Sequence, residues 1–303
     1  MFNSGRNLNF KNLLSGIILV LFCLFCFAPK ACAIRIGLNE GIKRTYVGSS
    51  MNASFFDATT GKLLFISRSF FPYPVKAYGD SIAIKVKGKY YDCQTNAIFI
   101  QNPQSRGFLA TKRKWYRGDL IVYNFDGKLT IVNSLPLEEY LMGVVPAEMP
   151  SRWNQEAHRA QAIAARSYAL ANLNKRASHG YDLKDTPQDQ AYGGASSETK
   201  QTTIAVLSTK GEVLTYDNKI IPAYYHASSG GKTIPAGEIW AHDLPYIQSV
   251  DSFDKGIKKN GHGVGMSQHG ANNLANKGFS AKQILNYFYK NISFARLKEE
   301  DEE

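Results

Sequence analysis

The sequence predicts an α+β fold, in which a β-rich N-terminal half packs with a mixed α/β C-terminal half that carries one long Ala-rich helix. Two observations lead to this prediction. Up to about residue 133, short segments are rich in β-branched and aromatic residues, and several alternate between polar and apolar positions. After residue 135, apolar residues recur at the spacing of one helix face instead.

The first 33 residues have the features of a secretory signal. Arg6 and Lys11 precede an almost unbroken apolar run over residues 13–28, and Ala31-Cys32-Ala33 has the small-x-small pattern of a signal-peptidase site. We therefore expect cleavage after Ala33 and export to the periplasm or cell wall. The alternative is that residues 13–28 remain as a membrane anchor, although a spanning helix needs about 20 apolar residues and this run is shorter.

Removal of the signal changes both the cysteine content and the charge. Only Cys93 of the four cysteines remains, so we expect no internal disulfide, although an exported protein could form one. The signal carries three basic residues and no acidic ones, which leaves +8 of the formal charge of +11. A basic exported protein is expected to meet a polyanion, such as a cell-wall polymer or an anionic membrane surface. No RNA-binding signature is present, so nucleic acid is not an expected partner.

The N-terminal half, residues 34–133, is predicted to form a β-rich part. Its strand segments are expected at residues 34–38, 62–66, 81–91, 96–100 and 119–133. Asp126-Gly127 lies inside the last segment and is the usual signal of a tight hairpin turn.

The C-terminal half is predicted to be a mixed core over residues 134–296, followed by a solvated acidic tail over 297–303. Pro136 should begin a short helix, since proline suits the first helical turn. The strongest helix prediction is 154–175, because five small or aromatic residues recur there at helical spacing. The other predicted elements are a helix at 197–209 capped by Ser197, a hairpin turning at 217–219, and helices at 268–276 and at 279–289, the latter capped by Ser280.

Glu148 is the first candidate for chemistry. Its neighbours from Val144 to Pro150 are uncharged, so burial should raise its pKa. A carboxylic acid that stays protonated near neutral pH can act as a general acid. The alternative is a structural role, in which Glu148 favours the positive N-terminal end of the following helix.

Further polar residues could bind a ligand. On the long helix, Arg166 could clamp a carboxylate or form an ordinary ion pair. The stretch YYHASSGGKT, residues 224–233, is rich in hydrogen-bond donors. It lacks the G-x-S-x-G pattern, and His226 and Ser228 share one strand end, which argues against a serine hydrolase.

The stretch GHGVGMSQHG, residues 261–270, combines flexible glycines with the start of a helix, an arrangement that suits an anion. His262 and His269 raise the question of a metal site. The usual His-x-x-x-His spacing is absent, and no cysteine or acidic ligand stands nearby, so we expect no metal. The alternative to a ligand site is a Gly-rich turn with a packed histidine.

Three stretches together resemble the SpoIID/LytB family, which comprises stage II sporulation protein D and the amidase enhancers. They are LPLEEYLMGVVPAEMPSRWNQEAHRAQAIAARSYAL, IPAYYHASSGGKT and GHGVGMSQHGANNLANKGFSAKQILNYFY. The resemblance covers essentially the whole mature chain and is weakest between Met51 and Lys114. It implies a lytic transglycosylase that cleaves peptidoglycan glycan strands, preferably strands stripped of stem peptides by an amidase. The family's catalytic acid is the Glu of the E-M-P motif, here Glu148.

The resemblance also implies roles for other residues. Arg166 would meet the muramic lactyl carboxylate. The remaining residues expected to line the glycan groove are Gln161, Tyr225, His226, Ser228, Ser229, His262, Ser267 and Gln268. Two alternatives stay open: a non-catalytic glycan-binding enhancer of an N-acetylmuramoyl-L-alanine amidase, and a two-carboxylate hydrolase that uses Glu156, Glu238 or Asp251 as its second acid.

One departure from the family concerns zinc. Some members carry a Cys/His zinc site in the loop after the long helix. Here that loop, residues 178–194, contains His179 but no cysteine. We therefore expect neither zinc nor any other cofactor, and we expect Asp182 and Asp185 to hold the loop through hydrogen bonds unless it is mobile.

Overall fold

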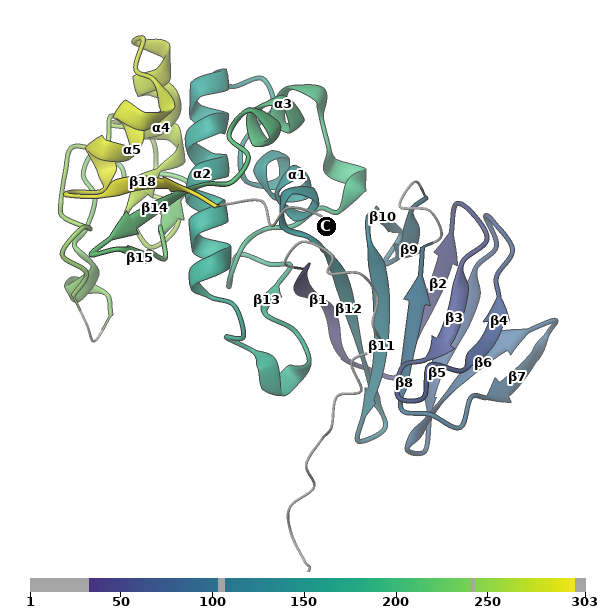
Figure 1. Ribbon diagram of the computed structural model, residues 1–303. Helices are drawn as coiled ribbons and strands as arrows, with labels where there is room; N and C mark the ends of the chain where they lie inside the picture. The colour runs from purple at the N-terminus through teal and green to yellow at the C-terminus, as the bar shows by residue number, and fades with distance from the viewer. Residues whose placement is uncertain (1–32, 103–106, 241–242, 298–303) are drawn as a thin grey trace, which may run out of the picture.

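A computed structural model describes residues 33–102, 107–240 and 243–297. Residues 1–32 of the predicted signal and 298–303 of the predicted acidic tail lie outside this description. The strands of the N-terminal half gather on one side of the molecule, and the helices of the C-terminal half gather on the other (Figure 1). The predicted α+β class is confirmed.

The larger sheet contains seven strands in the order β13-β1-β12-β11-β8-β3-β4. Asp126-Gly127 joins β11 to β12 as predicted, and both residues have the positive φ that such a turn requires. The strands that the N-terminal half supplies are β1 (Ala33–Ile42), β3 (Ser54–Asp57), β4 (Leu63–Ile66), β8 (Ala97–Gln101), β11 (Asp119–Phe125) and β12 (Lys128–Pro136).

The smaller sheet contains six strands in the order β10-β9-β2-β5-β6-β7. The predicted strand at 81–91 is in fact a hairpin, because Lys87 and Gly88 both take positive φ between β6 and β7. Apolar residues of the two sheets share one buried cluster, so the sheets pack face to face. The strands are β2 (Arg44–Ser49), β5 (Tyr73–Tyr78), β6 (Ser81–Val86), β7 (Lys89–Asp92), β9 (Leu109–Thr111) and β10 (Lys114–Tyr116).

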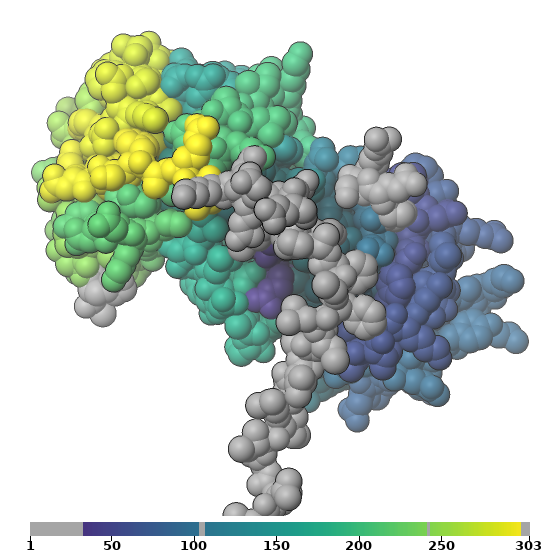
Figure 2. Space-filling model, in the orientation of Figure 1, coloured from purple at the N-terminus to yellow at the C-terminus, as the bar shows by residue number. Residues whose placement is uncertain are grey.

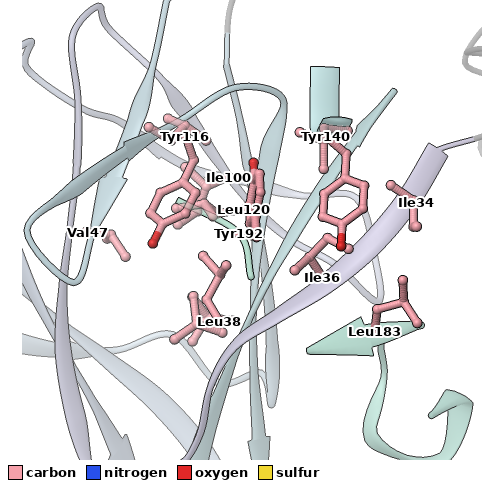
Figure 3. Packing of buried hydrophobic residues seen from close by; sticks show 14 of the residues in the cluster. Ile34, Ile36, Leu38, Val47, Ile100, Tyr116, Leu120, Tyr140, Leu183 and Tyr192 are labelled. Carbon is pink, nitrogen blue, oxygen red and sulfur yellow. The ribbon is translucent and has the colours of Figure 1, made fainter. Parts of the chain in front are cut away.

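The edge strand β13 (Leu183–Lys184) joins the two halves. It comes from the loop after the long helix and pairs in parallel with β1, with Leu183 opposite Ile36. Figure 3 shows Ile34 and Ile36 of β1 near Leu183 and near Tyr140 of the first helix. The hydrophobic core of the β-rich half therefore extends into the C-terminal half.

The first two helices position the candidate site. α1 (Leu137–Glu148) follows β12 directly, as Pro136 predicts. α2 (Gln155–Ala171) begins after Asn154, whose side chain accepts the Glu156 N–H. It ends four residues before the predicted boundary, because the chain turns after Ala171 and Asn174 takes a φ of 61°.

The other predicted elements of the C-terminal half are present, with one changed cap. α3 (Lys200–Ser208) is capped by Thr199 rather than Ser197, which belongs to a preceding 3-10 helix, η3 (Ala195–Ser197). The Ser280 capping box at α5 is confirmed. The remaining elements are β14 (Glu212–Tyr216), β15 (Lys219–Ile220), β16 (Tyr225–His226), β17 (Met266–Ser267), α4 (Gln268–Asn276), α5 (Ala281–Phe288) and β18 (Ser293–Arg296).

α2 lies at the centre of the C-terminal half and packs against α1, α3, α4 and α5. Small side chains on it, including Ala157, Ala160 and Ala164, are fully buried and let these neighbours approach closely. In the part of the chain that the structure describes, no helix is long and apolar enough to span a bilayer.

Candidate active site

Glu148 is the last residue of α1, and the chain leaves the helix at Met149 in an extended conformation. The C-terminal end of a helix carries partial negative charge, which disfavours an ionised carboxylate. α2 begins only at Gln155, and its own first-turn acid is Glu156. The structural alternative, in which Glu148 favours the N-terminal end of the next helix, is therefore wrong.

Three uncharged donors surround the Glu148 carboxylate. The Ala191 N–H donates to Oε1 at 2.7 Å, the Gln268 Nε2 donates to Oε2 at 3.0 Å, and the Tyr225 hydroxyl lies 3.5 Å from Oε1. Burial raises the pKa of Glu148, and these three hydrogen bonds offset that effect only in part. Within the described ranges, Glu148 forms no salt bridge that would keep it ionised.

Gln190 is fully buried and holds the Tyr225 hydroxyl in place beside Glu148. Its Nε2 donates to the Tyr225 hydroxyl at 2.8 Å and to the Ala165 carbonyl of α2 at 3.2 Å, while its Oε1 accepts from the Tyr140 hydroxyl. Tyr225 is thus held between the amide of Gln190 and the acid of Glu148. Gln190 and Ala191 were not predicted, because their roles depend on a loop that returns to α1 from more than 40 residues away and no local pattern marks them.

Three aspartates hold the loop that supplies Gln190 and Ala191. Asp182 pairs with Arg35 at 2.8 Å, and Asp185 pairs with Lys112 at 2.8 Å, so the predicted role of both residues is confirmed. Asp189 also pairs with Lys175 and Arg176. Over the described ranges, no cluster of three or more His, Cys, Asp or Glu side chains is arranged to hold a metal ion.

β16 and β17 bring two predicted loops together beside Glu148. They pair in parallel, with Tyr225 opposite Met266 and His226 opposite Ser267. His226 donates from Nδ1 to the Val264 carbonyl, so its Nε2 is free to accept a hydrogen bond from the Ser229 hydroxyl. Burial lowers the pKa of His226 to about 4, which makes it a neutral hydrogen-bonding group at pH 7.

His262 lies next to His226, with a distance of 5.5 Å between ring centroids. Its Nδ1 accepts the Val264 N–H at 3.0 Å. Burial is the main cause that lowers its pKa, and the charge of Lys259 adds to it. Both histidines are therefore held neutral on the same side of the site.

Asp254 organises these loops and was not predicted from the sequence. Its carboxylate is fully buried and accepts four hydrogen bonds, from the Ser229 and Gly231 N–H groups and from the Ser252 and Ser267 hydroxyls. Ser267 in turn caps α4 by accepting the Gly270 N–H. Asp254 thereby fixes the start of α4, where Gln268 reaches Glu148.

Comparison with known proteins gives a family match for the region that carries Glu148. Residues 125–216, which include α1, Glu148 and α2, match the family model SpoIID, described as stage II sporulation protein. Over this region the chain is similar to the SpoIID family.

Individual relatives match over a similar extent. The chain is 40% identical to "Stage II sporulation protein D" of Bacillus subtilis over 140 residues, 41% of each chain. It is 35% identical over 136 residues to an uncharacterized protein of Brachyspira hyodysenteriae, 45% of this chain and 37% of that protein. It is also 41% identical over 107 residues to "Amidase enhancer" of B. subtilis, 35% of this chain and 14% of that protein. The matched regions thus span about two fifths of the first two relatives and less of the third.

Not every predicted ligand-binding residue lies at the site. Arg166 is fully buried and forms a two-point ion pair with Glu138, at 2.8 and 2.7 Å, so it is not available to a substrate carboxylate. Ser228 is also buried, and its hydroxyl donates to the Lys258 carbonyl. Both predictions are corrected, because each side chain holds two segments of the chain together.

Gln161 is a different case. It lies on α2 between His158, whose ring contacts the Pro150 carbonyl, and Ala165, whose carbonyl accepts from Gln190. Its amide is fully buried and has no hydrogen-bond partner in the described structure. A side chain that is fully buried in the free protein does not line a glycan groove, so this prediction is also corrected. Of the predicted set, Tyr225 and Gln268 contact Glu148 directly. His226 and Ser267 are buried and hydrogen-bonded within the protein, so they support the adjoining loops rather than line a groove. Ser229 and His262 are partly exposed in the same loops.

Proposed function

We propose that the protein is an exported peptidoglycan lytic transglycosylase that cleaves glycan strands, preferably strands stripped of stem peptides, with Glu148 as its general acid and base. The observation that carries this proposal is the environment of Glu148. Its pKa is raised by burial, it is surrounded by neutral donors, and its side chain is still partly exposed. These are the properties of a carboxylic acid that can donate a proton near neutral pH.

The reaction needs only one such group. Glu148 would donate its proton to the glycosidic oxygen as the bond from that oxygen to C1 of the muramic residue breaks. The C6 hydroxyl of the same residue would attack C1, and its proton would return to Glu148. The products are a 1,6-anhydro-muramic end and a new strand end, and no water is consumed.

The neighbours of Glu148 support both halves of this cycle. When Glu148 is ionised, the Ala191 N–H and the Gln268 amide each donate a hydrogen bond to the carboxylate. Neither donor is charged, so neither holds the acid permanently ionised. In the adjoining loops, the partly exposed Ser229 hydroxyl, held by the neutral His226, would offer a hydrogen-bonding atom to a sugar hydroxyl.

A second candidate is an enhancer that binds glycan and stimulates an N-acetylmuramoyl-L-alanine amidase without cutting the strand. The match to a relative named "Amidase enhancer" favours it. The two functions can coexist, because glycan binding is common to both.

The experiment that tests the proposal uses residues 34–303, purified and incubated with amidase-treated glycan strands, with the products identified by mass spectrometry. The control is Glu148→Gln, which keeps the shape of the side chain and removes the acid. We expect anhydro-muramic ends from the wild type and none from the variant. Reducing muramic ends would indicate a hydrolase instead. Binding without cleavage, under conditions where a known lytic enzyme cuts, would favour the enhancer.

A further inference from the structure

One face of the smaller sheet is unusually rich in tyrosine and basic side chains. The cross-strand pairs Arg44–Lys76, Lys76–Ala83 and Lys85–Tyr90, together with the alternation along each strand, place six side chains on the same face. They are Arg44 and Tyr46 of β2, Lys76 and Tyr78 of β5, Lys85 of β6 and Tyr90 of β7. We call this set the tyrosine–lysine face.

The opposite face of the same strands packs into the core, since Val47, Val75 and Ile84 are buried there. The tyrosine–lysine face is open: Tyr46, Tyr78 and Tyr90 are 61%, 55% and 44% exposed. Strands β5, β6 and β7 lie on the side of the molecule away from the helices (Figure 1). In the space-filling view, side chains of this part of the chain project from that edge into solvent (Figure 2).

Asp92 of β7 also lies on this face, but its carboxylate accepts hydrogen bonds from the Ser81 hydroxyl and the Gln94 N–H, and it forms no ion pair with the cations within the described ranges. The lysines of the face have aromatic neighbours instead. Lys76 Nζ lies 4.4 Å from the ring centroid of Tyr90 and 5.3 Å from that of Tyr78, and Lys85 Nζ lies 5.8 Å from Tyr90. Across the described ranges, Arg44, Lys76 and Lys85 form no ion pair. Arg44 is exposed, and Lys76 and Lys85 are partly exposed. A cation that reaches the surface without an acidic partner is available to an anion from outside.

We propose that the tyrosine–lysine face is a second glycan-binding surface, which holds a carboxylate-bearing polysaccharide strand at a distance from Glu148. The flat face of a tyrosine ring packs against the C–H groups of a pyranose, since the ring face carries partial negative charge. Each muramic residue of a stripped peptidoglycan strand carries one lactyl carboxylate, which complements the three free cations. The inference rests on the proposed function for the identity of the polymer.

An anionic membrane is the competing partner, because Phe70 and Phe71 precede β5 and are 75% and 48% exposed. The face itself favours the sugar. Its aromatic groups are tyrosines, which add a hydroxyl for hydrogen bonding, and its six side chains include no aliphatic residue that would enter a bilayer.

The test measures binding of residues 34–303 to purified amidase-stripped glycan strands. Every protein carries Glu148→Gln, so that no strand is cut during the measurement. The first variant is Lys76→Gln/Lys85→Gln, and its charge-matched control is Lys128→Gln/Lys219→Gln, two exposed lysines elsewhere on the surface. The second variant is Tyr90→Ser, and its control is Tyr91→Ser, an exposed tyrosine paired with the inward-facing Ile84.

We expect each face variant to weaken strand binding by roughly tenfold, and each control by less than about twofold. Strand binding that is unchanged in both face variants would overturn the proposal. The proposal would also be overturned if the face variants lost binding to vesicles of phosphatidylglycerol and phosphatidylcholine but kept their binding to the strands. That result would identify the face as a membrane-binding surface. Cleavage of short soluble strands, measured with Glu148 restored, reports separately on the proposed function and is expected to be unchanged by Tyr90→Ser.

Discussion

Glu148 destabilises the folded protein when it is ionised, because burial raises its pKa above the value it has in the unfolded chain. At pH values below the pKa that Glu148 has in the unfolded chain, the side chain is protonated in both states, and this destabilisation vanishes. As pH rises, the unfolded chain releases the proton first, and the free energy of unfolding falls. The penalty is complete once the pH exceeds the folded pKa. An acid that is kept for catalysis is expected to carry such a penalty.

We therefore expect Glu148→Gln to stabilise the protein at pH 7 by about 1 kcal/mol, or about 2–4 °C in Tm. Glutamine retains an oxygen that can accept the Ala191 N–H. The gain should disappear at acid pH, where Glu148 is neutral. Thermal melts of both proteins from pH 4 to pH 8 check this. A gain that is equally large at pH 4 would show that the effect does not come from ionisation.

Asp254 is expected to behave in the opposite way. Burial alone would raise its pKa, but hydrogen bonds from Ser252, Ser267, Ser229 and Gly231 outweigh this effect and lower it. The ionised carboxylate thus stabilises the folded protein fully at pH values above the pKa that Asp254 has in the unfolded chain. This contribution is lost as the pH falls through the lower pKa that Asp254 has in the folded protein.

Asp254→Asn should destabilise the protein by about 2–3 kcal/mol, because one oxygen is replaced by a donor that faces other donors. Glycan cleavage should fall at temperatures where the variant remains folded, since Ser267 and therefore Gln268 lose their anchor. Urea unfolding and the product assay measure the two effects. The control is Asp243→Asn, whose carboxylate is exposed and accepts the N–H of Leu244. Full cleavage by a folded Asp254→Asn would contradict the positioning role.

At the scale of elements, the pair between Arg166 and Glu138 links α2 to α1. Arg166 is fully buried, whereas the Glu138 side chain is 19% exposed. Arg166 also donates to the Glu212 carbonyl, so it connects these helices to β14. The pair holds α1, and with it Glu148, against the central helix.

Glu138→Gln should destabilise the protein by about 3 kcal/mol, because it leaves the Arg166 charge buried without an anion. Glu138→Gln/Arg166→Met should lose less than the sum of the two single variants, since the double variant leaves no unpaired charge. A double-mutant cycle in urea measures the coupling. Additive losses would mean that the two side chains do not act as a pair.

Elements set by local signals could be predicted from the sequence, and those set by distant partners could not. The Asp126-Gly127 hairpin, the alanine periodicity of α2 and the Ser280 cap are local, and all were predicted correctly. The partners of Arg166 lie in α1 and β14, so the sequence could not separate an internal ion pair from a ligand clamp. Gln190 and Asp254 were missed for the same reason, since each bridges segments that are far apart in the chain.

At the scale of the whole molecule, the β-rich half and the helical half depend on each other. α1 continues β12 without a linker, and β13 lies on the edge of the larger sheet beside β1. Removing residues 34–133 would uncover apolar residues of the C-terminal half, including Leu183 and Tyr140.

A fragment of residues 134–303 is therefore expected not to fold cooperatively, whereas residues 34–303 should unfold in one transition. Circular dichroism during heating and during urea titration compares the two proteins. A sharp transition in the fragment, coincident for far- and near-ultraviolet signals, would show that the C-terminal half folds independently.

The pairing of β13 with β1 also bears on the order in which the chain folds. β1 is the first strand of the described residues, yet it lies inside the larger sheet between β12 and β13. Its contact between Ile36 and Leu183 closes a loop of nearly 150 residues, and such long-range contacts slow folding. The larger sheet cannot be completed until the segment that follows α2 has been synthesised. Folding of the N-terminal half should therefore finish only after the chain has passed the residues that carry Glu148.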